Sequence, residues 1–362
     1  MNITTAEGKI AADLLAHLRT ALGDNDIQYA KPPVRITGGF DTEIYAFRVH
    51  GAGEEWSGPL ILRFFRSDNS MVTLSGPERA RFETAVQNAI HSMGYPAPRV
   101  LYTCADSESL GAAFLVMERM PGRVMLELLF RPSRFWFRLP DILAEAQARL
   151  HGLQPQVLRQ AVEAADVPGR VLTVGDWLEQ IASLIGEAQL EGLKPGLAWL
   201  LDNEPNNSQS TVICHGDFHP LNILMGKSRV TGVIDWPWVK VAPPEYDVGA
   251  TIAIFGQGPL DLPAFLSGAF NVFRRQAIAR YLRAYQRLRP LDARAIRYYE
   301  AVRLIGFLFE AGEQRQADLG IMTGPVKPTA FGAQLGVKRI ILRFREITGI
   351  ALRLPPRTSR IS

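Results

Sequence analysis

Four polar side chains lie close together in the stretch CHGDFHPLNILMGKSRVTGVIDW, residues 214–236: His215, Asp217, Asn222 and Asp235. Apolar residues with strand character separate them. A carboxylate buried without a partner is costly, so polar groups in such a stretch need either a structural or a chemical role. One carboxylate and one amide offer the hard oxygen donors that suit Mg²⁺. The second carboxylate is then left to orient a hydroxyl and accept its proton.

The residues between these side chains predict a β-hairpin. Residues 222–225 read as a short strand, GKSR at 226–229 as a turn, and VTGVIDW as the returning strand. This register sets Asn222 opposite Asp235, to within one pair of residues. Asp217 lies five residues before Asn222. We therefore expect one end of the hairpin to gather all three oxygen-bearing side chains.

Two other interpretations of this stretch stay open. His215 and His219 raise the alternative of a zinc site, but Asp217 lies between them and no clear third zinc ligand follows. The hairpin is also compatible with a structural role in which the polar residues only cap turns. A metal-bound carboxylate and amide beside a free carboxylate match the needs of phosphoryl transfer best, because the metal neutralises phosphate charge while the free carboxylate aligns the attacking hydroxyl.

The elements that must position these residues divide the chain in two. Strand patterns occupy residues 34–50, 59–66, 99–104 and 113–120, with a helical pattern at 78–93 between them. Later helical patterns occupy residues 140–153, 155–166, 175–190, 262–288, 291–312 and 333–347. A β-rich first third before a helix-rich remainder predicts two lobes with a cleft. We place the N-terminal lobe at residues 1–118 and the C-terminal lobe at 119–362.

Composition is that of a globular protein able to bury a core. The 362 residues are 47% hydrophobic and 21% charged. No run of about 18 apolar residues and no signal peptide is evident, and Cys104 and Cys214 match no metal or redox spacing, so we expect a cytoplasmic protein without a membrane partner. Seven basic residues and one acid follow Val337. We interpret them as a solvated helix face with a loose end and expect no nucleic-acid partner.

The run HGDFHPLN, with IDW thirteen residues past Asn222, resembles the signature of the aminoglycoside phosphotransferase and choline kinase family, whose fold is similar to that of protein kinases. Other stretches follow in the family's order over roughly residues 30–310. ITGGFDTEIY resembles the glycine loop, LILR the phosphate-binding strand, RFETAVQNAIHSMGYPAPRVL the helix that bears a glutamate, FLVMERMPG the hinge, and PPEYDVGA the segment after the metal aspartate. The resemblance implies an α+β, bilobal, protein-kinase-like fold.

The resemblance also implies a role for each matching residue of the catalytic run. Asp217 would be the catalytic base, and His215 would support its loop. Asn222 and Asp235 would bind Mg²⁺.

On the nucleotide side, the implied residues are Gly38, Gly39, Arg63, Glu83, Met117, Glu118 and Met120. Arg63 would pair with Glu83 and orient the ATP phosphates through its guanidinium fork. The backbone near Glu118 and Met120 would hold the adenine edge beneath Met117. Family members usually have lysine where Arg63 stands.

These features predict a small-molecule kinase that moves the γ-phosphate of ATP to a hydroxyl. A protein kinase fits less well, because Gly216 replaces the arginine that reads activation-loop phosphate and APPE begins only seven residues after Asp235. Asp41 stands in the glycine loop where the family often has Ser-Asn, and a carboxylate there would repel phosphates. A non-catalytic, kinase-like nucleotide-binding protein is therefore the alternative.

Two features bear on the acceptor, which we expect to be an aminoglycoside-like or macrolide-like antibiotic or a metabolite. Carboxylates that would suit a cationic sugar are Glu245, Glu310, Glu313 and Asp318. The aromatic and basic stretch RVMLELLFRPSRFWFRLP, residues 123–140, would instead suit a lid over an apolar substrate, or it packs the lobe. The sequence leaves both open.

Overall fold

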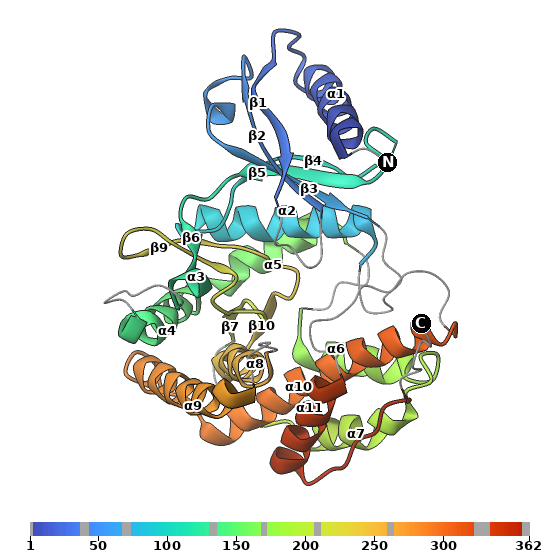
Figure 1. Cartoon of the computed structure of the whole chain (residues 1–362), viewed down its shortest axis with the longest axis vertical. Helices are drawn as coiled ribbons and strands as arrows, with labels where there is room; N and C mark the ends of the chain where they lie inside the picture. The colour runs from blue at the N-terminus through green and yellow to red at the C-terminus, as the bar shows by residue number, and fades with distance from the viewer. Residues whose placement is uncertain are drawn as a thin grey trace.

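The computed structural model describes residues 3–36, 43–66, 74–106, 108–129, 136–167, 172–205, 211–258, 264–321 and 334–356. Figure 1 shows a β-rich upper lobe that holds the N-terminal part of the chain and a mainly helical lower lobe that holds the rest. The predicted bilobal α+β fold is confirmed. The exact boundary after residue 118 stays a prediction.

A five-stranded antiparallel sheet forms the upper lobe, in the order β1-β2-β3-β5-β4. Its strands are β1 (Gln28–Arg35), β2 (Glu43–His50), β3 (Leu60–Phe65), β4 (Val100–Cys104) and β5 (Ala113–Glu118). Two helices accompany the sheet, α1 (Ile3–Leu22) and α2 (Gly76–Ser92). In Figure 1, α2 runs beneath the sheet, on the side of the lower lobe.

Strand β3 has an apolar core on both of its faces, because successive side chains of a strand point to opposite sides. Leu62 and Phe64 belong to the core that α1 completes, while Ile61 and Phe65 belong to a second cluster that includes Ala80 of α2. Arg63 lies between Leu62 and Phe64 in sequence, so it shares the face of Ile61 and Phe65. This alternation directs Arg63 toward α2.

Helices dominate the lower lobe. They are α3 (Met125–Leu129), α4 (Leu139–Leu150), α5 (Pro155–Ala164), α6 (Val174–Leu184), α7 (Lys194–Asp202), α8 (Pro244–Gln257), α9 (Ala264–Gln286), α10 (Ala293–Asp318) and α11 (Gln334–Thr348). Two small antiparallel sheets complete the lobe. One pairs β7 (Val212–Cys214) with β10 (Lys240–Ala242), and the other joins β6 (Arg123–Val124), β8 (Ile223–Met225) and β9 (Val230–Val233).

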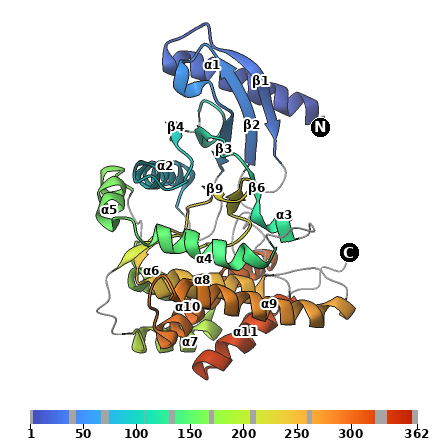
Figure 2. The ribbon, with the colours of Figure 1, turned by 90° about the vertical axis from the view of Figure 1, so that its left-hand side faces the viewer.

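Helix α8 lies at the centre of this lobe. In the view of Figure 2, α4, α8 and α10 lie one beneath another under the upper lobe. The contact between α8 and α10 is close enough to need glycine, because a Cβ on Gly249 would lie 2.7 Å from the backbone nitrogen of Glu300. Most residues of α8 are buried. It therefore has no amphipathic stripe, which is the pattern that reveals a helix in sequence.

Each helical pattern predicted from the sequence corresponds to a helix of the structure. The helices α3, α7 and α8 and the short strands β6, β7 and β10 were not predicted. The strand predicted at 34–50 corresponds to the end of β1 and the whole of β2, and residues 37–42 between them lie outside the described part of the chain.

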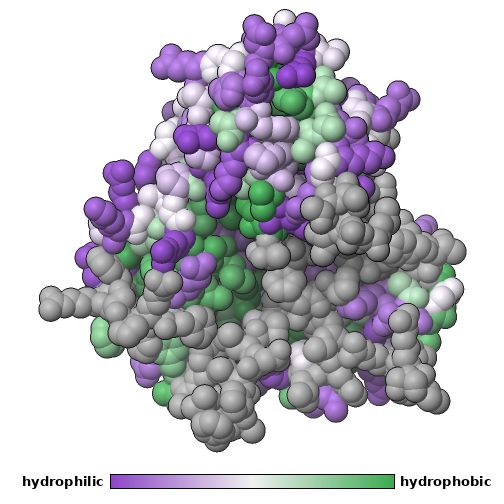
Figure 3. Space-filling view, turned by 45° about the horizontal axis from the view of Figure 1, so that its top comes forward, coloured by the Kyte–Doolittle hydropathy of each residue, from purple (hydrophilic) through white to green (hydrophobic). Residues whose placement is uncertain are grey.

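Cys104 and Cys214 are both buried free thiols. Within the described residues, no helix is both long enough and apolar enough to cross a bilayer. On the face shown in Figure 3, hydrophobic residues gather in a hollow just below the hydrophilic upper lobe.

The packing of α8 on α10 predicts the outcome of a helix-glycine substitution. We expect Gly249→Ala to destabilise the protein by about 1–3 kcal/mol, because the new methyl group would overpack the contact with α10. Gly256→Ala on the same helix is the matched control, since a Cβ there meets nothing within 4 Å. It should be neutral or stabilise by about 0.5–1 kcal/mol. Chemical denaturation measures both, and equal free energies of unfolding for the two variants would contradict the packing.

Candidate active site

The predicted hairpin is present, with a register one residue from the central expectation. Ile223 pairs with Val233, and the backbone N–H of Ile234 donates to the carbonyl of Asn222 at 3.0 Å. Asn222 therefore faces Ile234, and Asp235 follows directly, which is within the predicted margin of one pair. The turn at 226–229 closes with a hydrogen bond of 2.9 Å between its first and last residues.

Asp235 has a left-handed backbone conformation, with φ of 68°. Such a conformation is uncommon for a residue other than glycine and costs on the order of 1–3 kcal/mol where the surroundings impose it. The side chain of Asp235 accepts a hydrogen bond from Nη2 of Arg63 at 2.9 Å. Asp235, two residues after β9, thus combines an unusual backbone conformation with a side-chain contact to Arg63 of the upper lobe.

Arg63 joins two carboxylates that come from different parts of the chain. Its Nη1 lies 3.0 Å from Oε2 of Glu83 on α2, and its Nη2 lies 2.9 Å from Asp235. Arg63 and Glu83 are almost completely buried, at 4% and 0% exposure. Arg79 reaches the other oxygen of Glu83 at 3.7 Å, and the Arg63 guanidinium lies over the Phe65 ring. The predicted pair of Arg63 and Glu83 is confirmed.

Asp217 receives hydrogen bonds from three side chains. Arg303 Nη2 donates to Oδ1 at 3.0 Å, Asn222 Nδ2 donates to Oδ2 at 3.0 Å, and His219 Nε2 lies 3.2 Å from Oδ2. Burial raises the pKa of the Asp217 carboxyl, but the charge and hydrogen bond of His219 and the charge of Arg303 outweigh it. The pKa is therefore held well below its ordinary value, and the group stays ionised.

Arg303 is a site residue that the sequence analysis did not predict. It comes from α10, 86 residues after Asp217 in sequence, and no motif marks it. Its guanidinium lies over two aromatic rings, 5.3 Å from the centre of Trp238 and 4.6 Å from the centre of Phe307. The side chain of Arg303 is buried, and these rings together with Asp217 fix its position.

Helix α8 anchors the loop that carries Asp217. The carboxylate of Asp247 accepts hydrogen bonds from the backbone N–H groups of His215 at 3.0 Å and Gly216 at 2.7 Å, and it lies 3.0 Å from Nε2 of His151. Although Asp247, His151 and Cys214 lie close enough to hold a metal ion, Asp247 already has these hydrogen-bond partners. We therefore interpret this buried cluster as a structural anchor.

His215 supports the same loop, as predicted. It is fully buried, its Nε2 lies 3.1 Å from the carbonyl of Ile234, and its Nδ1 accepts from the backbone N–H of Asp217 at 3.3 Å. Burial lowers the pKa of the His215 imidazole, which favours the neutral ring. Because both ring nitrogens are already used, His215 is not free to bind zinc together with His219. The zinc alternative does not fit this geometry.

The donors that remain fit Mg²⁺. Since the amide nitrogen of Asn222 is engaged with Asp217, its oxygen is the atom left to meet a cation. The side chain of Asp235 is 35% exposed, so its carboxylate is accessible to solvent. One carboxylate and one amide oxygen form a hard donor set, as the sequence predicts.

The two hinge N–H groups expected near an adenine ring, those of Glu118 and Met120, differ in their hydrogen bonding. Met117 is buried, and the backbone N–H of Glu118 donates to the carbonyl of Arg99 at 2.9 Å, so this N–H is unavailable to a nucleotide. In the described part of the chain, no hydrogen bond uses the backbone N–H of Met120. Gly38 and Gly39, which the resemblance assigned to the nucleotide, and Asp41 of the same loop lie outside the described residues.

The prediction that four carboxylates line the site of a cationic acceptor is wrong for two of them, Glu245 and Glu313. Glu245 is fully buried and accepts a hydrogen bond from the backbone N–H of Asp292, which precedes α10. Glu313 is 1% exposed, so it does not face a solvent-filled cleft either. Glu310 is partly buried, and Asp318 is exposed at the end of α10.

Solved structures with the same fold include several phosphotransferases. A candidate aminoglycoside phosphotransferase from Ralstonia eutropha superposes with a TM-score of 0.63 and 18% identity, covering 94% of this chain and 99% of that one. An ethanolamine kinase from Plasmodium vivax gives a TM-score of 0.57 at 11% identity, covering 89% and 82% of the two chains. At these identities the comparison shows the fold alone.

Sequence relatives and a family model identify the family of this chain. The aminoglycoside 3'-phosphotransferase of Streptomyces fradiae is 32% identical over 191 residues, which are 50% of this chain and 64% of that protein. Human acyl-CoA dehydrogenase family member 11 is 28% identical over 193 residues, which are 52% of this chain and 24% of that protein, so the chain matches only about a quarter of that relative's length. The model of the phosphotransferase enzyme family matches residues 34–301. The chain belongs to the phosphotransferase enzyme family.

Proposed function

We propose that this protein is a small-molecule kinase, which uses Mg²⁺ and transfers the γ-phosphoryl group of ATP to a hydroxyl. The observation that carries the proposal is the convergence of three groups at one end of the β8-β9 hairpin. An ionised carboxylate, an amide and a partly exposed carboxylate meet there, next to a buried arginine that is already paired with a glutamate. Family membership supports the same reaction type.

In this proposal Asp217 acts as the catalytic base. Its carboxylate is ionised and held by three donors, so it can accept a hydrogen bond from the acceptor hydroxyl and align the oxygen for in-line attack. Proton transfer to a carboxylate with a low pKa is favourable only late in the reaction, when the hydroxyl oxygen has begun to bond to phosphorus. Orientation is therefore the larger part of its contribution.

Asn222, Asp235 and Arg63 act on the nucleotide. A bound Mg²⁺ would neutralise charge on the β and γ phosphate oxygens. Asn222 and Asp235 would hold it, and Arg63 would direct its guanidinium to the phosphates while Glu83 keeps it in place. The free backbone N–H at Met120 would meet the adenine edge.

The direct test of the proposal is an ADP-release assay with a panel of hydroxyl compounds. Aminoglycosides, macrolides, choline, homoserine and simple sugars should be compared, each with ATP and with GTP. We expect at least one compound to raise ADP release well above the rate without acceptor. If the protein binds nucleotide but no hydroxyl compound raises ADP release, the non-catalytic alternative replaces the kinase.

Replacing Asp217 separates chemistry from nucleotide binding. We expect Asp217→Asn to lower kcat by roughly 100-fold or more, because the amide cannot accept the proton. The affinity for Mg²⁺-ATP, measured by titration calorimetry, should stay within about threefold of the wild-type value. A variant that keeps full turnover would show that Asp217 is not the base.

Replacing Asp235 should instead weaken the binding of the nucleotide. Asparagine tolerates the left-handed backbone at this position, so Asp235→Asn removes charge with little added strain. We expect it to weaken nucleotide binding in the presence of Mg²⁺ to the level measured with EDTA. Calorimetry with and without Mg²⁺ measures the difference, and an undiminished effect of Mg²⁺ in this variant would rule out Asp235 as a ligand.

Arg303 is predicted to be a positioning residue for Asp217. We expect Arg303→Met to lower kcat about tenfold or more while the KM for ATP changes little, because a charged hydrogen bond to the base is lost. Arg303→Lys should restore part of the loss. Arg343→Met is the control, since Arg343 on α11 forms an ion pair with Glu300 on α10 at 2.7 Å. Equal effects of the two methionine variants would point to a general loss of stability.

A further inference from the structure

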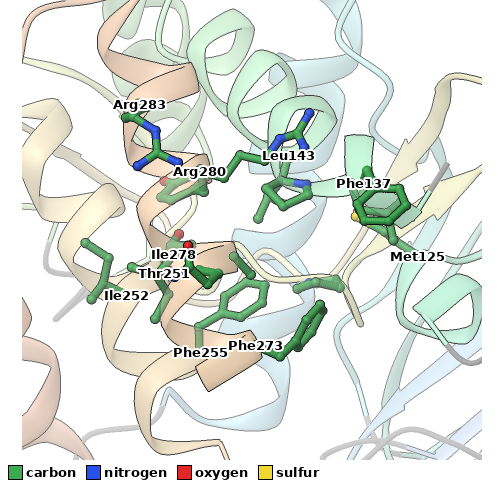
Figure 4. A pocket seen from close by; sticks show the side chains of 16 residues that line it. Met125, Phe137, Leu143, Thr251, Ile252, Phe255, Phe273, Ile278, Arg280 and Arg283 are labelled. Carbon is green, nitrogen blue, oxygen red and sulfur yellow. The ribbon is translucent and has the colours of Figure 1, made fainter. Parts of the chain in front are cut away.

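A cavity of about 340 Å³ opens in the lower lobe between α3, α4, α8 and α9. Figure 4 shows side chains from all four helices converging on it, among them Met125, Leu143, Ile252 and Ile278. A volume of this size lies at the lower end of the range for small-molecule sites. The cavity can thus hold one small ligand or one substituent of a larger ligand.

The wall of the cavity is mainly apolar. Twelve of the sixteen residues that line it have hydrophobic side chains, counting prolines and Tyr281, and none of the sixteen is an acid. Phe137 lines it with a side chain that is 68% exposed, although large aromatic side chains are seldom left so open to solvent. An apolar hollow beside an exposed aromatic ring favours a hydrophobic ligand.

The cavity reaches the loop that carries the proposed base. Pro220, which lies between Asp217 and Asn222 in sequence, is part of the wall. The carbonyl of Pro220 accepts a hydrogen bond from the backbone N–H of Leu126 on α3 at 3.1 Å. Thr251 also lines the cavity, and its hydroxyl donates to the carbonyl of Phe218 at 2.9 Å. A ligand seated there would therefore contact the same loop as the reacting hydroxyl.

The charges around the cavity disfavour a cationic ligand. Arg280 and Arg283 belong to the wall, and Arg287 follows directly after the last residue of α9. Asp141 pairs with Arg280 at 3.0 Å and lies 3.6 Å from Arg287, so one carboxylate stands against three guanidinium groups. An ammonium group placed here would meet a net positive charge.

We propose that this cavity binds the apolar portion of the phosphoryl acceptor, and that the acceptor is an alcohol with a hydrophobic body and no positive charge. This inference rests on the proposed function and specifies its substrate class. The cavity fixes the body of the acceptor while its hydroxyl extends past Pro220 toward Asp217. Aminoglycosides, which are polycationic, would be poor acceptors.

Binding can be tested without any turnover. Titration calorimetry with straight-chain alcohols of increasing length, in the absence of nucleotide, should show an affinity that rises about fourfold per methylene group until the cavity is full. Chains with a terminal carboxylate should bind at least as well as the uncharged alcohols, and those with a terminal ammonium should bind tenfold or more weakly. An affinity independent of chain length, or a preference for ammonium, would overturn the proposal.

A matched pair of variants tests whether the alcohols bind in this cavity. Ala277 lines the cavity, so Ala277→Phe should fill part of it and remove most of the dependence on chain length. Val272 lies on the same helix, is 59% exposed and is outside the lining, so Val272→Phe should leave that dependence unchanged. Thermal unfolding checks that both variants fold. Chain-length dependence that survives in a folded Ala277→Phe protein would place binding elsewhere and overturn the proposal.

Measurements of turnover then test the proposed acceptor class separately from the proposed phosphotransferase reaction. ADP release with the same alcohols should rise with chain length in the wild-type protein and in Val272→Phe, but not in Ala277→Phe. If aminoglycosides raise ADP release and the apolar alcohols do not, the substrate class proposed here is wrong while the phosphotransferase stands. If the alcohols bind in the cavity but neither they nor any other compound raises ADP release, the proposed function itself fails.

Discussion

The carboxylate of Asp247 is the group on which the rest of the site depends. It is buried inside the lower lobe and binds the backbone N–H groups of His215 and Gly216 directly before Asp217. Burial raises the pKa of the Asp247 carboxyl, and the hydrogen bond from His151 together with that residue's charge lowers it below its ordinary value. An ionised acceptor with several donors ties the loop to the central helix α8, and breaking a buried network of this kind is strongly destabilising. The position of Asp217 is thereby set by the core of the lobe.

The second constraint is the repulsion among the carboxylates of the site. The two acidic groups at the hairpin end pair with different arginines. Asp217 binds Arg303 from α10, and Asp235 binds Arg63 from β3. The two partners come from different lobes, so the hairpin is linked by charge to the upper sheet on one side and to the helical core on the other. We infer that nucleotide phosphates would compete with Asp235 for Arg63, whereas Arg303 would stay with Asp217 throughout.

The sequence predicted those parts of the site that depend on local pattern. The hairpin follows from two short strand patterns on either side of a turn. The pair of Arg63 and Glu83 was implied by the resemblance of the surrounding stretches to the strand and the helix of the family. Helix α8 could not be predicted in this way, because it is buried on nearly all sides and has no polar face. Arg303 could not be predicted either, since only the packing of α10 on α8 brings it to Asp217. Glu245 and Glu313 had the right charge for an acceptor wall, but tertiary packing places them in the interior.

We infer that the three side chains at the hairpin end hold one metal ion and one reacting hydroxyl. A crystal structure of the protein with Mg²⁺ and a non-hydrolysable ATP analogue tests it most directly. We predict a metal ion about 2.0–2.1 Å from the amide oxygen of Asn222 and from a carboxylate oxygen of Asp235, the distance typical of Mg²⁺. Asp217 should face the γ-phosphate without binding the metal and should keep its contact with Arg303. A metal ion bound away from Asn222 and Asp235, or a nucleotide bound outside the space between the two lobes, would contradict the account.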